Sequence, residues 1–262
     1  MLTKYNTKSF LIFIKVKLVL LIFFSSCVSK KQVIYLQDLK DIDVRKTNII
    51  QHTFQENDIL KIDVTSLETR ASVPYNKVPP NVGIGNSINL LQLSGYLVSN
   101  KKTINFPVLG LISVAGKNTE VLESYIKNRL QREGHLINPS VSVRLLNAKV
   151  TLLGEVKAPG TYTFTENNMS FLQALGLAGD LTIEGDRKNI TLIRESDGQR
   201  TTTSLDLTSA SWLSSPYQNI QPNDVIIVNP NSKKVTSAGL IGNISTILSI
   251  ASIVLSTIIL IK

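Results

Sequence analysis

Cys27 is the only cysteine of the chain, and it directly follows an apolar run and two serines. Upstream of it lie four lysines and no acidic residue. A basic start, a short apolar run and small residues before a cut are typical of an export signal. A cysteine at the cut indicates a bacterial lipoprotein signal, in which the thiol is acylated. We therefore expect residues 1–27 to be a signal with a lipidated Cys27. The alternative is an uncleaved anchor helix, for which the apolar run is short.

Removal of this signal changes what the composition implies. The formal net charge of +9 falls to about +5, because four lysines leave and no acid does. No strong basic field then remains, which argues against a nucleic-acid partner. No thiol remains for a disulfide or a metal, so the exported part must rely on its hydrophobic core. Its length is sufficient for one or two small domains.

The C-terminal end is apolar as well. Residues 238–261 contain no charge, and as a helix they would extend about 36 Å, enough to span a bilayer core. We expect a transmembrane helix over residues 236–262. Small residues recur along it at spacings of three and four, which places them on one face. They are Gly242, Ser245, Ser249, Ser252 and Ser256. This face either packs against other helices and lines a pore, or is incidental to a simple anchor.

The middle of the chain predicts short strands with few helices. Apolar and polar residues alternate from Leu60 to Val64 after an Asn57–Asp58 turn signal, which indicates a half-buried strand. Further strands are expected at 96–98, 104–108, 109–114 and 141–145, with a long loop at 70–93. The best helix is 119–132, with Asn118 or Thr119 as its cap, five apolar positions on one face and Gly134 at its end.

The second half continues in the same style. We expect strands at 149–153, 189–194, 201–205 and 224–228, and a helix at 170–178. Gln55-Glu56-Asn57-Asp58-Ile59 is echoed by Gln221-Pro222-Asn223-Asp224-Val225, which predicts the same turn before a strand in both halves. The fold class is therefore α+β, with small mixed β domains. Residues 28–52 are predicted to be a linker with weak local structure.

Several motifs resemble those of the bacterial outer-membrane polysaccharide export proteins (Wza-like). In the first half these are the Asn57–Asp58 turn and strand, residues 95–98 and 104–110, and Asn138-Pro139-Ser140-Val141. In the second half the string Leu153-Gly154-Glu155-Val156-Lys157-Ala158-Pro159-Gly160 resembles the soluble-ligand-binding β-grasp (SLBB) module. The resemblance implies a polysaccharide-export domain at 53–147 and an SLBB domain at 148–230.

The resemblance also implies a function. It predicts a lipid-anchored, ring-forming outer-membrane lipoprotein with its body in the periplasm, which exports capsular or exopolysaccharide without catalysis. It implies a homo-oligomer and an inner-membrane partner, either a polysaccharide co-polymerase or a tyrosine kinase. Two departures stand out: the chain has room for only one β-grasp module, and its terminal helix is more hydrophobic than an amphipathic pore-lining helix. The alternative function is a periplasmic sugar-binding or scaffolding lipoprotein.

No pattern in the sequence indicates an enzyme. His52 and His135 are far apart in the sequence, and we expect them to be surface or capping residues. No catalytic triad, metal motif or phosphate loop is present, and Gly83-Ile84-Gly85 lies in a predicted loop. We predict neither a cofactor nor a metal. Four residues of the SLBB string are candidate site residues, as a structural turn or a sugar contact. They are Gly154, Glu155, Pro159 and Gly160.

Overall fold

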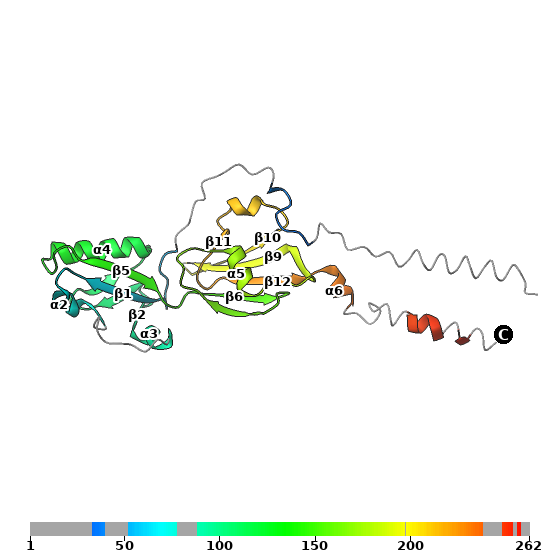
Figure 1. Cartoon of the computed structure of the whole chain (residues 1–262), viewed down its shortest axis with the longest axis horizontal. Helices are drawn as coiled ribbons and strands as arrows, with labels where there is room; N and C mark the ends of the chain where they lie inside the picture. The colour runs from blue at the N-terminus through cyan, green and yellow to red at the C-terminus, as the bar shows by residue number, and fades with distance from the viewer. Residues whose placement is uncertain are drawn as a thin grey trace, which may run out of the picture.

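The computed structural model describes residues 33–39, 52–77, 88–196, 198–237, 248–253 and 256–257. Two α+β domains lie next to each other along the long axis of the molecule (Figure 1). Each has its own hydrophobic cluster, and Leu145 packs against both. We call residues 52–146 the first domain and residues 148–230 the second. The mixed α+β class predicted from the sequence is confirmed.

The first domain is built on a three-stranded antiparallel sheet in the order β2-β1-β5. Its strands are β1 (Ile59–Thr65), β2 (Tyr96–Leu97) and β5 (Ser140–Leu145). The predicted alternation in β1 is confirmed, since Leu60, Ile62 and Val64 are buried. A separate hairpin of β3 (Thr103–Phe106) and β4 (Gly110–Ser113) adds to the same core.

Helix α4 (Thr119–Arg132) has the bounds that the sequence predicted. The side chain of Asn118 caps it by accepting the N–H of Val121 at 2.9 Å. Leu122, Ile126 and Leu130 are fully buried, as expected. Val121 and Tyr125, which we also expected in the apolar face, are exposed by 48% and 36%. Only three of the five predicted apolar positions therefore belong to the core.

The end of α4 is a Schellman motif. Gly134 has φ of 75°, which suits glycine. Its N–H donates to the carbonyl of Gln131 at 3.1 Å, and the N–H of His135 donates to that of Leu130 at 2.9 Å. His135 therefore takes part in the end of α4 through its backbone N–H.

The prediction of a long loop over 70–93 is wrong for the residues that the structure describes there. They form α2 (Thr69–Ser72), the 3-10 turn η3 (Val73–Tyr75) and α3 (Ile88–Ser94). The side-chain amide of Asn76 attaches the residues after η3 to strand β1. It accepts the N–H of Val64 and donates to the carbonyl of Val64, each at 2.8 Å, so it satisfies the backbone of β1 as a strand would. Gly83, Ile84 and Gly85 lie outside the described residues.

The second domain contains a five-stranded sheet in the order β10-β9-β12-β6-β7. Its strands are β6 (Lys149–Gly154), β7 (Gly160–Thr163), β9 (Gly185–Ser196), β10 (Gln199–Leu205) and β12 (Val225–Pro230). β12 runs parallel to β6, and the other neighbours are antiparallel. Helix α5 (Phe171–Leu177) begins with a capping box at Ser170 and buries Phe171, Ala174 and Leu175. Two hairpins, a helix and a central parallel pair make a β-grasp arrangement.

Several short elements of the second domain were not predicted. They are β7, β8 (Met169–Ser170), β11 (Asn219–Ile220) and the 3-10 turn η4 (Ser211–Ser214). Strands of two residues carry no readable periodicity, and they form here because β8 and β11 pair with each other. Trp212 of η4 is buried against Phe171, with ring centroids 5.7 Å apart.

Residues 33–39, which fall in the predicted linker, pack against the second domain. The N–H groups of Leu36 and Gln37 donate to the carbonyls of Leu207 and Thr208 at 3.0 and 2.7 Å. The phenol of Tyr35 donates to Asp180 at 2.6 Å, and its ring lies 5.3 Å from the Arg187 guanidinium. We call residues 33–39 the strap. In the sequence, the first domain is therefore inserted between the strap and the second domain, whereas in space the strap lies on the second domain (Figure 1).

The C-terminal segment is only partly described. Helix α6 (Ser232–Ser237) follows β12, and residues 248–253 and 256–257 are helical. Among the described residues, no helix has both the length and the apolar character that a membrane crossing requires. Much of the predicted 236–262 span, including Gly242 and Ser245, lies outside them.

The predicted echo between the two halves is present in the structure. Asn57 and Asn223 both adopt a left-handed backbone, with φ of 67° and 69°. The next residue in each case is a buried aspartate, Asp58 or Asp224, from which a strand starts. The two domains therefore share one turn-then-strand device.

Candidate functional site

Gly154 ends β6 at a place where a side chain does not fit. Its φ is +83°, and a Cβ built on it would lie 2.1 Å from the carbonyl oxygen of Val228 in β12. The parallel pair of β6 and β12 therefore requires glycine here, both for backbone conformation and for space. The role is structural, as the sequence suggested for this residue.

Glu155 follows directly and is already engaged by other side chains. Its carboxylate lies 2.9 Å from the ammonium of Lys234 in α6 and accepts the hydroxyl of Thr182 at 2.9 Å. Lys234 also pairs with Glu184 at 2.6 Å. These contacts, Lys234 first, hold the pKa of Glu155 below its ordinary value. Glu155 therefore ties α6 to the body of the second domain.

Pro159 and Gly160 lie at the far end of the same loop. Gly160 is the first residue of β7 and pairs with Leu152, and it does not have a positive φ. The connection from β6 to β7 is thus a five-residue loop over 155–159, not a tight Pro-Gly turn. Its backbone is held by bonds from Lys157 to Asp180 and from Ala158 to Ala178.

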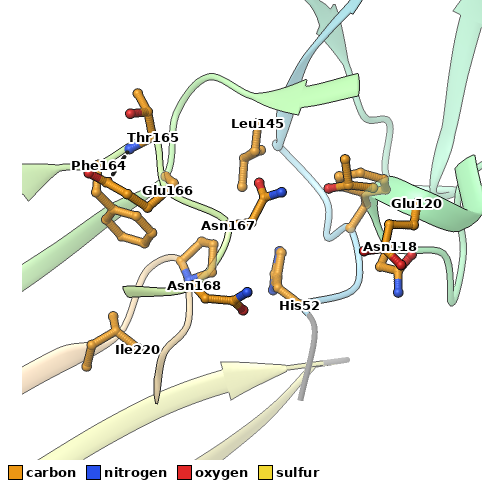
Figure 2. A pocket seen from close by; sticks show the side chains of 14 residues that line it. His52, Asn118, Glu120, Leu145, Phe164, Thr165, Glu166, Asn167, Asn168 and Ile220 are labelled. Carbon is orange, nitrogen blue, oxygen red and sulfur yellow. Dashed lines mark hydrogen bonds between the residues drawn. The ribbon is translucent and has the colours of Figure 1, made fainter. Parts of the chain in front are cut away.

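A cavity of about 80 Å³ lies at the junction between the domains, and Figure 2 shows it from close by. None of the four predicted site residues lines it. The first domain contributes His52, Phe54, Leu145 and the first turn of α4 with its cap, residues 118–120. The second domain contributes the loop at 164–168 between β7 and β8, together with Ala148, Ile220 and Pro222.

The polar groups around this cavity come from both domains. In Figure 2 the side chains of Asn167 and Asn168 lie around the same space as the ring of His52. The His52 ring nitrogen is 3.3 Å from the carboxylate of Asp58, whose side chain is only 3% exposed. His52 is therefore a junction residue paired with a buried acid, which corrects the expectation of a surface or capping histidine.

Glu120 and Glu166 are the acidic residues of the lining, and no lysine or arginine joins them within the described ranges. Asn167 and Asn168 are exposed, and their side-chain amides make no hydrogen bond with the described part of the chain. The cavity therefore offers unused donors and acceptors above a floor formed by apolar side chains.

The remaining predicted site residues lie elsewhere. Ser249, Ser252 and Ser256 fall in described helical residues, and the Ser252 hydroxyl donates to the carbonyl of Leu248 at 2.7 Å. Cys27, Gly242 and Ser245 lie outside the described residues. Within the described residues, no group of three acidic, histidine or cysteine side chains has the arrangement that a metal would need.

Sequence reasoning missed the junction cavity because its lining is spread over the chain. His52, residues 118–120 and residues 164–168 become neighbours only through the packing of the two domains. The one local signal was the Asn167–Asn168 pair, and such a pair in a loop is typical of any solvated turn. The sequence did not predict the strap, because Tyr35 and Asp38 bind residues of the second domain that are distant in the sequence.

Comparisons with known proteins agree with this two-domain structure. Residues 51–146 match the polysaccharide biosynthesis/export protein family, and residues 149–203 match the SLBB domain. The EPS I polysaccharide export outer membrane protein EpsA of Ralstonia nicotianae is 37% identical over 106 residues, 39% of this chain and 27% of that protein. The capsule polysaccharide export protein BexD of Haemophilus influenzae is 26% identical over 206 residues, 77% of this chain and 49% of that protein.

A third relative is the capsule polysaccharide export outer membrane protein CtrA of Neisseria meningitidis. It is 27% identical over 185 residues, 69% of this chain and 45% of that protein. Each of these three matches spans less than half the length of the relative. The order of the two matched domains is the order of the two domains in the structure. The chain therefore contains a polysaccharide biosynthesis/export domain at residues 51–146, followed by an SLBB domain at residues 149–203.

Proposed function

We propose that this chain is a lipid-anchored, ring-forming component that exports capsular or exopolysaccharide across the outer membrane. The observation that carries the proposal is the pairing of an export domain with an SLBB domain in one chain. The three relatives described above are named as polysaccharide export proteins. The role is passage of a polymer and not catalysis.

Lipidation of Cys27 would attach the SLBB domain, and not the export domain, to the membrane. The strap begins at Val33, and an extended chain of six residues reaches about 20 Å. Because the strap packs on the SLBB domain, the lipid would hold that domain close to the outer membrane. The export domain would then extend into the periplasm, where an inner-membrane co-polymerase or tyrosine kinase is the proposed partner.

The C-terminal residues 236–262 are proposed to add a transmembrane helix. Its start, α6, is fixed to the SLBB domain through Lys234 and the two carboxylates of Glu155 and Glu184. The small-residue face that includes Ser249, Ser252 and Ser256 would pack against neighbouring copies. Whether that packing forms a pore or only a bundle of anchors depends on the subunit number.

Two experiments on the full-length protein test this function. Electron microscopy after extraction in detergent should show rings of identical subunits, whereas a monodisperse monomer would favour a periplasmic binding or scaffolding lipoprotein. Labelling of cells with a fatty-acid analogue should mark the wild type and not Cys27→Ala. Label that is retained on the alanine variant would exclude acylation at this cysteine.

A further inference from the structure

We propose that a pocket at the end of the SLBB domain binds the headgroup of a membrane phospholipid, and that it prefers a headgroup with both a phosphate and a primary ammonium. We call it the headgroup pocket. Its lining consists of Val33, residues 183–186, Lys188 and residues 231–234. None of these residues lines the cavity between the domains. The proposal rests on the membrane attachment that forms part of the proposed function.

The headgroup pocket is formed by three segments that are fixed to one another. The N–H of Asn231 donates to the carbonyl of Glu184 at 2.7 Å, and Lys234 of α6 pairs with the Glu184 carboxylate at 2.6 Å. The strap, which begins at Val33, is held on the same domain by the bond from Tyr35 to Asp180. The pocket volume of about 590 Å³ lies within the range of about 300–1,000 Å³ that is typical of small-molecule sites. The pocket therefore has room for a headgroup.

The lining carries charges of both signs. Alternation along β9 places Asp186 and Lys188 on the same face of the strand, with the buried Arg187 between them on the other face. Lys233 adds a second exposed ammonium from α6. Among the described residues, neither of these two lysines has a carboxylate within ion-pair distance. Two ammonium groups in one pocket suit the oxygens of a phosphate.

Asp186 suits the other half of such a headgroup. Its carboxylate accepts the backbone N–H of Lys188 at 3.0 Å. A carboxylate has about four lone-pair sites, so Asp186 can also accept from a primary ammonium. A quaternary ammonium has no N–H to donate. The pocket should therefore prefer phosphoethanolamine over phosphocholine.

The position of the pocket favours a membrane lipid as its occupant. Val33 is six residues from Cys27, which an extended chain covers in about 20 Å. On the other side, α6 ends at Ser237, and the uncharged residues 238–261 follow directly. Figure 1 shows the strap and α6 towards the end of the SLBB domain that is remote from the first domain. Both proposed attachments to the membrane therefore start at the pocket.

Exposed apolar side chains accompany these charges. Ile183 lines the pocket and is 65% exposed, and Val235 of α6 is 60% exposed. Ile34 in the strap, next to Val33, is 42% exposed. Lysines beside apolar side chains are typical of a surface at the bilayer interface, where headgroups bind the charges and acyl chains cover the apolar groups. A water-soluble headgroup compound would leave these apolar side chains in water, so it should bind more weakly than the lipid.

Native mass spectrometry of the full-length protein in a non-ionic detergent tests the binding. Phosphatidylethanolamine should bind at least about tenfold more tightly than diacylglycerol, which lacks the phosphate. It should also bind more tightly than phosphatidylcholine and than the water-soluble glycerophosphoethanolamine. Equal binding of diacylglycerol would overturn the site. Equal binding of phosphatidylcholine would overturn the preference for a primary ammonium, and equal binding of the soluble compound would overturn the assignment to a membrane lipid.

Lysine variants localise the phosphate. The double change Lys188→Gln and Lys233→Gln should weaken binding of phosphatidylethanolamine at least about tenfold, since it removes two charge-assisted hydrogen bonds. The matched control is Lys101→Gln with Lys127→Gln, which removes the same charge from two exposed lysines of the first domain. The control should bind the lipid like the wild type. Equal binding by the two double variants would contradict the role of the pocket lysines.

An aspartate variant localises the ammonium. Asp186→Asn keeps an oxygen that can accept the Lys188 N–H, but it has no charge to pair with an ammonium. It should weaken binding of phosphatidylethanolamine and leave phosphatidylglycerol, which has no ammonium, bound at least as tightly as before. A loss of the same size for both lipids would show that Asp186 does not recognise the ammonium.

The outcome for the pocket is distinguishable from the outcome for export. Acylation of Cys27, rings in the electron microscope and polymer export test the proposed function, and none of these measurements uses the lipid probes. A protein that is acylated, forms rings and exports polymer but does not select phosphatidylethanolamine would refute the headgroup pocket alone. Selective binding that depends on Lys188 and Lys233, in a protein that forms no ring, would refute the export ring alone.

Discussion

Asp58 and Asp224 hold equivalent positions in the two domains. Each carboxylate accepts the backbone N–H of the glutamine three residues earlier, at 2.8 Å in both cases. The two are 2% and 1% exposed, so each needs a partner for its charge. Asp58 has the half-buried His52 at the domain junction, whereas Asp224 has Arg194, which is itself buried. The same turn motif thus has a different side-chain partner in each domain.

We predict that Arg194→Leu strongly destabilises the SLBB domain. Arg194 donates to both oxygens of Asp224, at 2.9 and 2.7 Å, and to the carbonyl of Asn219 at 2.9 Å. Burial raises the pKa of the Asp224 carboxyl, and Arg194 opposes that rise. Without the arginine a buried charge is left unpaired, which costs about 3–5 kcal/mol of unfolding free energy.

Fluorescence of Trp212, the only tryptophan and a core residue of that domain, can follow the denaturant unfolding. The control is Arg200→Leu, since Arg200 pairs with Glu195 at 3.1 Å on the surface, with side chains 71% and 55% exposed. That change should cost less than about 1 kcal/mol. Equal effects of the two variants would mean that the buried pair contributes no more than the exposed one.

Gly154→Ala should be far more damaging than Gly198→Ala. Both glycines have a left-handed backbone, with φ of +83° and +75°, so both variants carry the same conformational cost of about 1 kcal/mol. Only Gly154 would also place its Cβ 2.1 Å from the carbonyl of Val228, while nothing lies within 4 Å of the Cβ at Gly198. The difference between the two unfolding free energies isolates the steric term at the β6–β12 pair. Similar losses of unfolding free energy in the two variants would mean that β6 and β12 accommodate the added Cβ without a measurable energetic cost.

The sequence predicted the parts of the fold that depend on local patterns. Helix α4 was predicted residue for residue because its cap, its apolar spacing and Gly134 all lie within the helix or beside it. The β1 strand and the repeated turn were predicted for the same reason. The strap, the Asn76 bridge and the cavity could not be predicted, because their partners are distant in sequence and are selected by packing. The five-residue loop before Gly160 was misjudged because Pro-Gly alone does not reveal the contact with residues 178–180.

The strap should detach in acid. The Asp38 carboxylate accepts from the Ser209 hydroxyl at 2.8 Å and from the N–H of Ala210, and these bonds lower its pKa from the ordinary 3.8. An acid with a lowered pKa stabilises the docked state when it is ionised. That contribution is therefore complete above the ordinary value and is lost as the pH falls through the lowered one.

Trp212 lies close to Ala210 in the chain, so its fluorescence can report the detachment of the strap. Its fluorescence should show a transition below about pH 4 in the wild type. Asp38→Asn should weaken docking at neutral pH and remove this transition. Glu133→Gln is the control, because the pKa of Glu133 is also lowered, by Arg129, but in the export domain. A wild-type titration identical to that of Asp38→Asn would show that Asp38 does not hold the strap.

The last prediction concerns the small-residue face of the C-terminal helix. In lipid, helices associate through close packing and hydrogen bonds, not through burial of apolar surface from water. Changing Ser249 and Ser252 to leucine makes the segment more apolar, so insertion should be unaffected. The larger side chains should nevertheless keep neighbouring helices apart, and the variant should reach the membrane but cross-link poorly and export less polymer.

The Ser252 hydroxyl already bonds to the Leu248 carbonyl of its own helix, so the expected loss comes mainly from packing. Ser252→Ala, which keeps the side chain small and removes that hydroxyl, should therefore assemble almost normally. If the double leucine variant cross-links and exports like the wild type, the helix is an anchor and ring assembly rests on the two α+β domains.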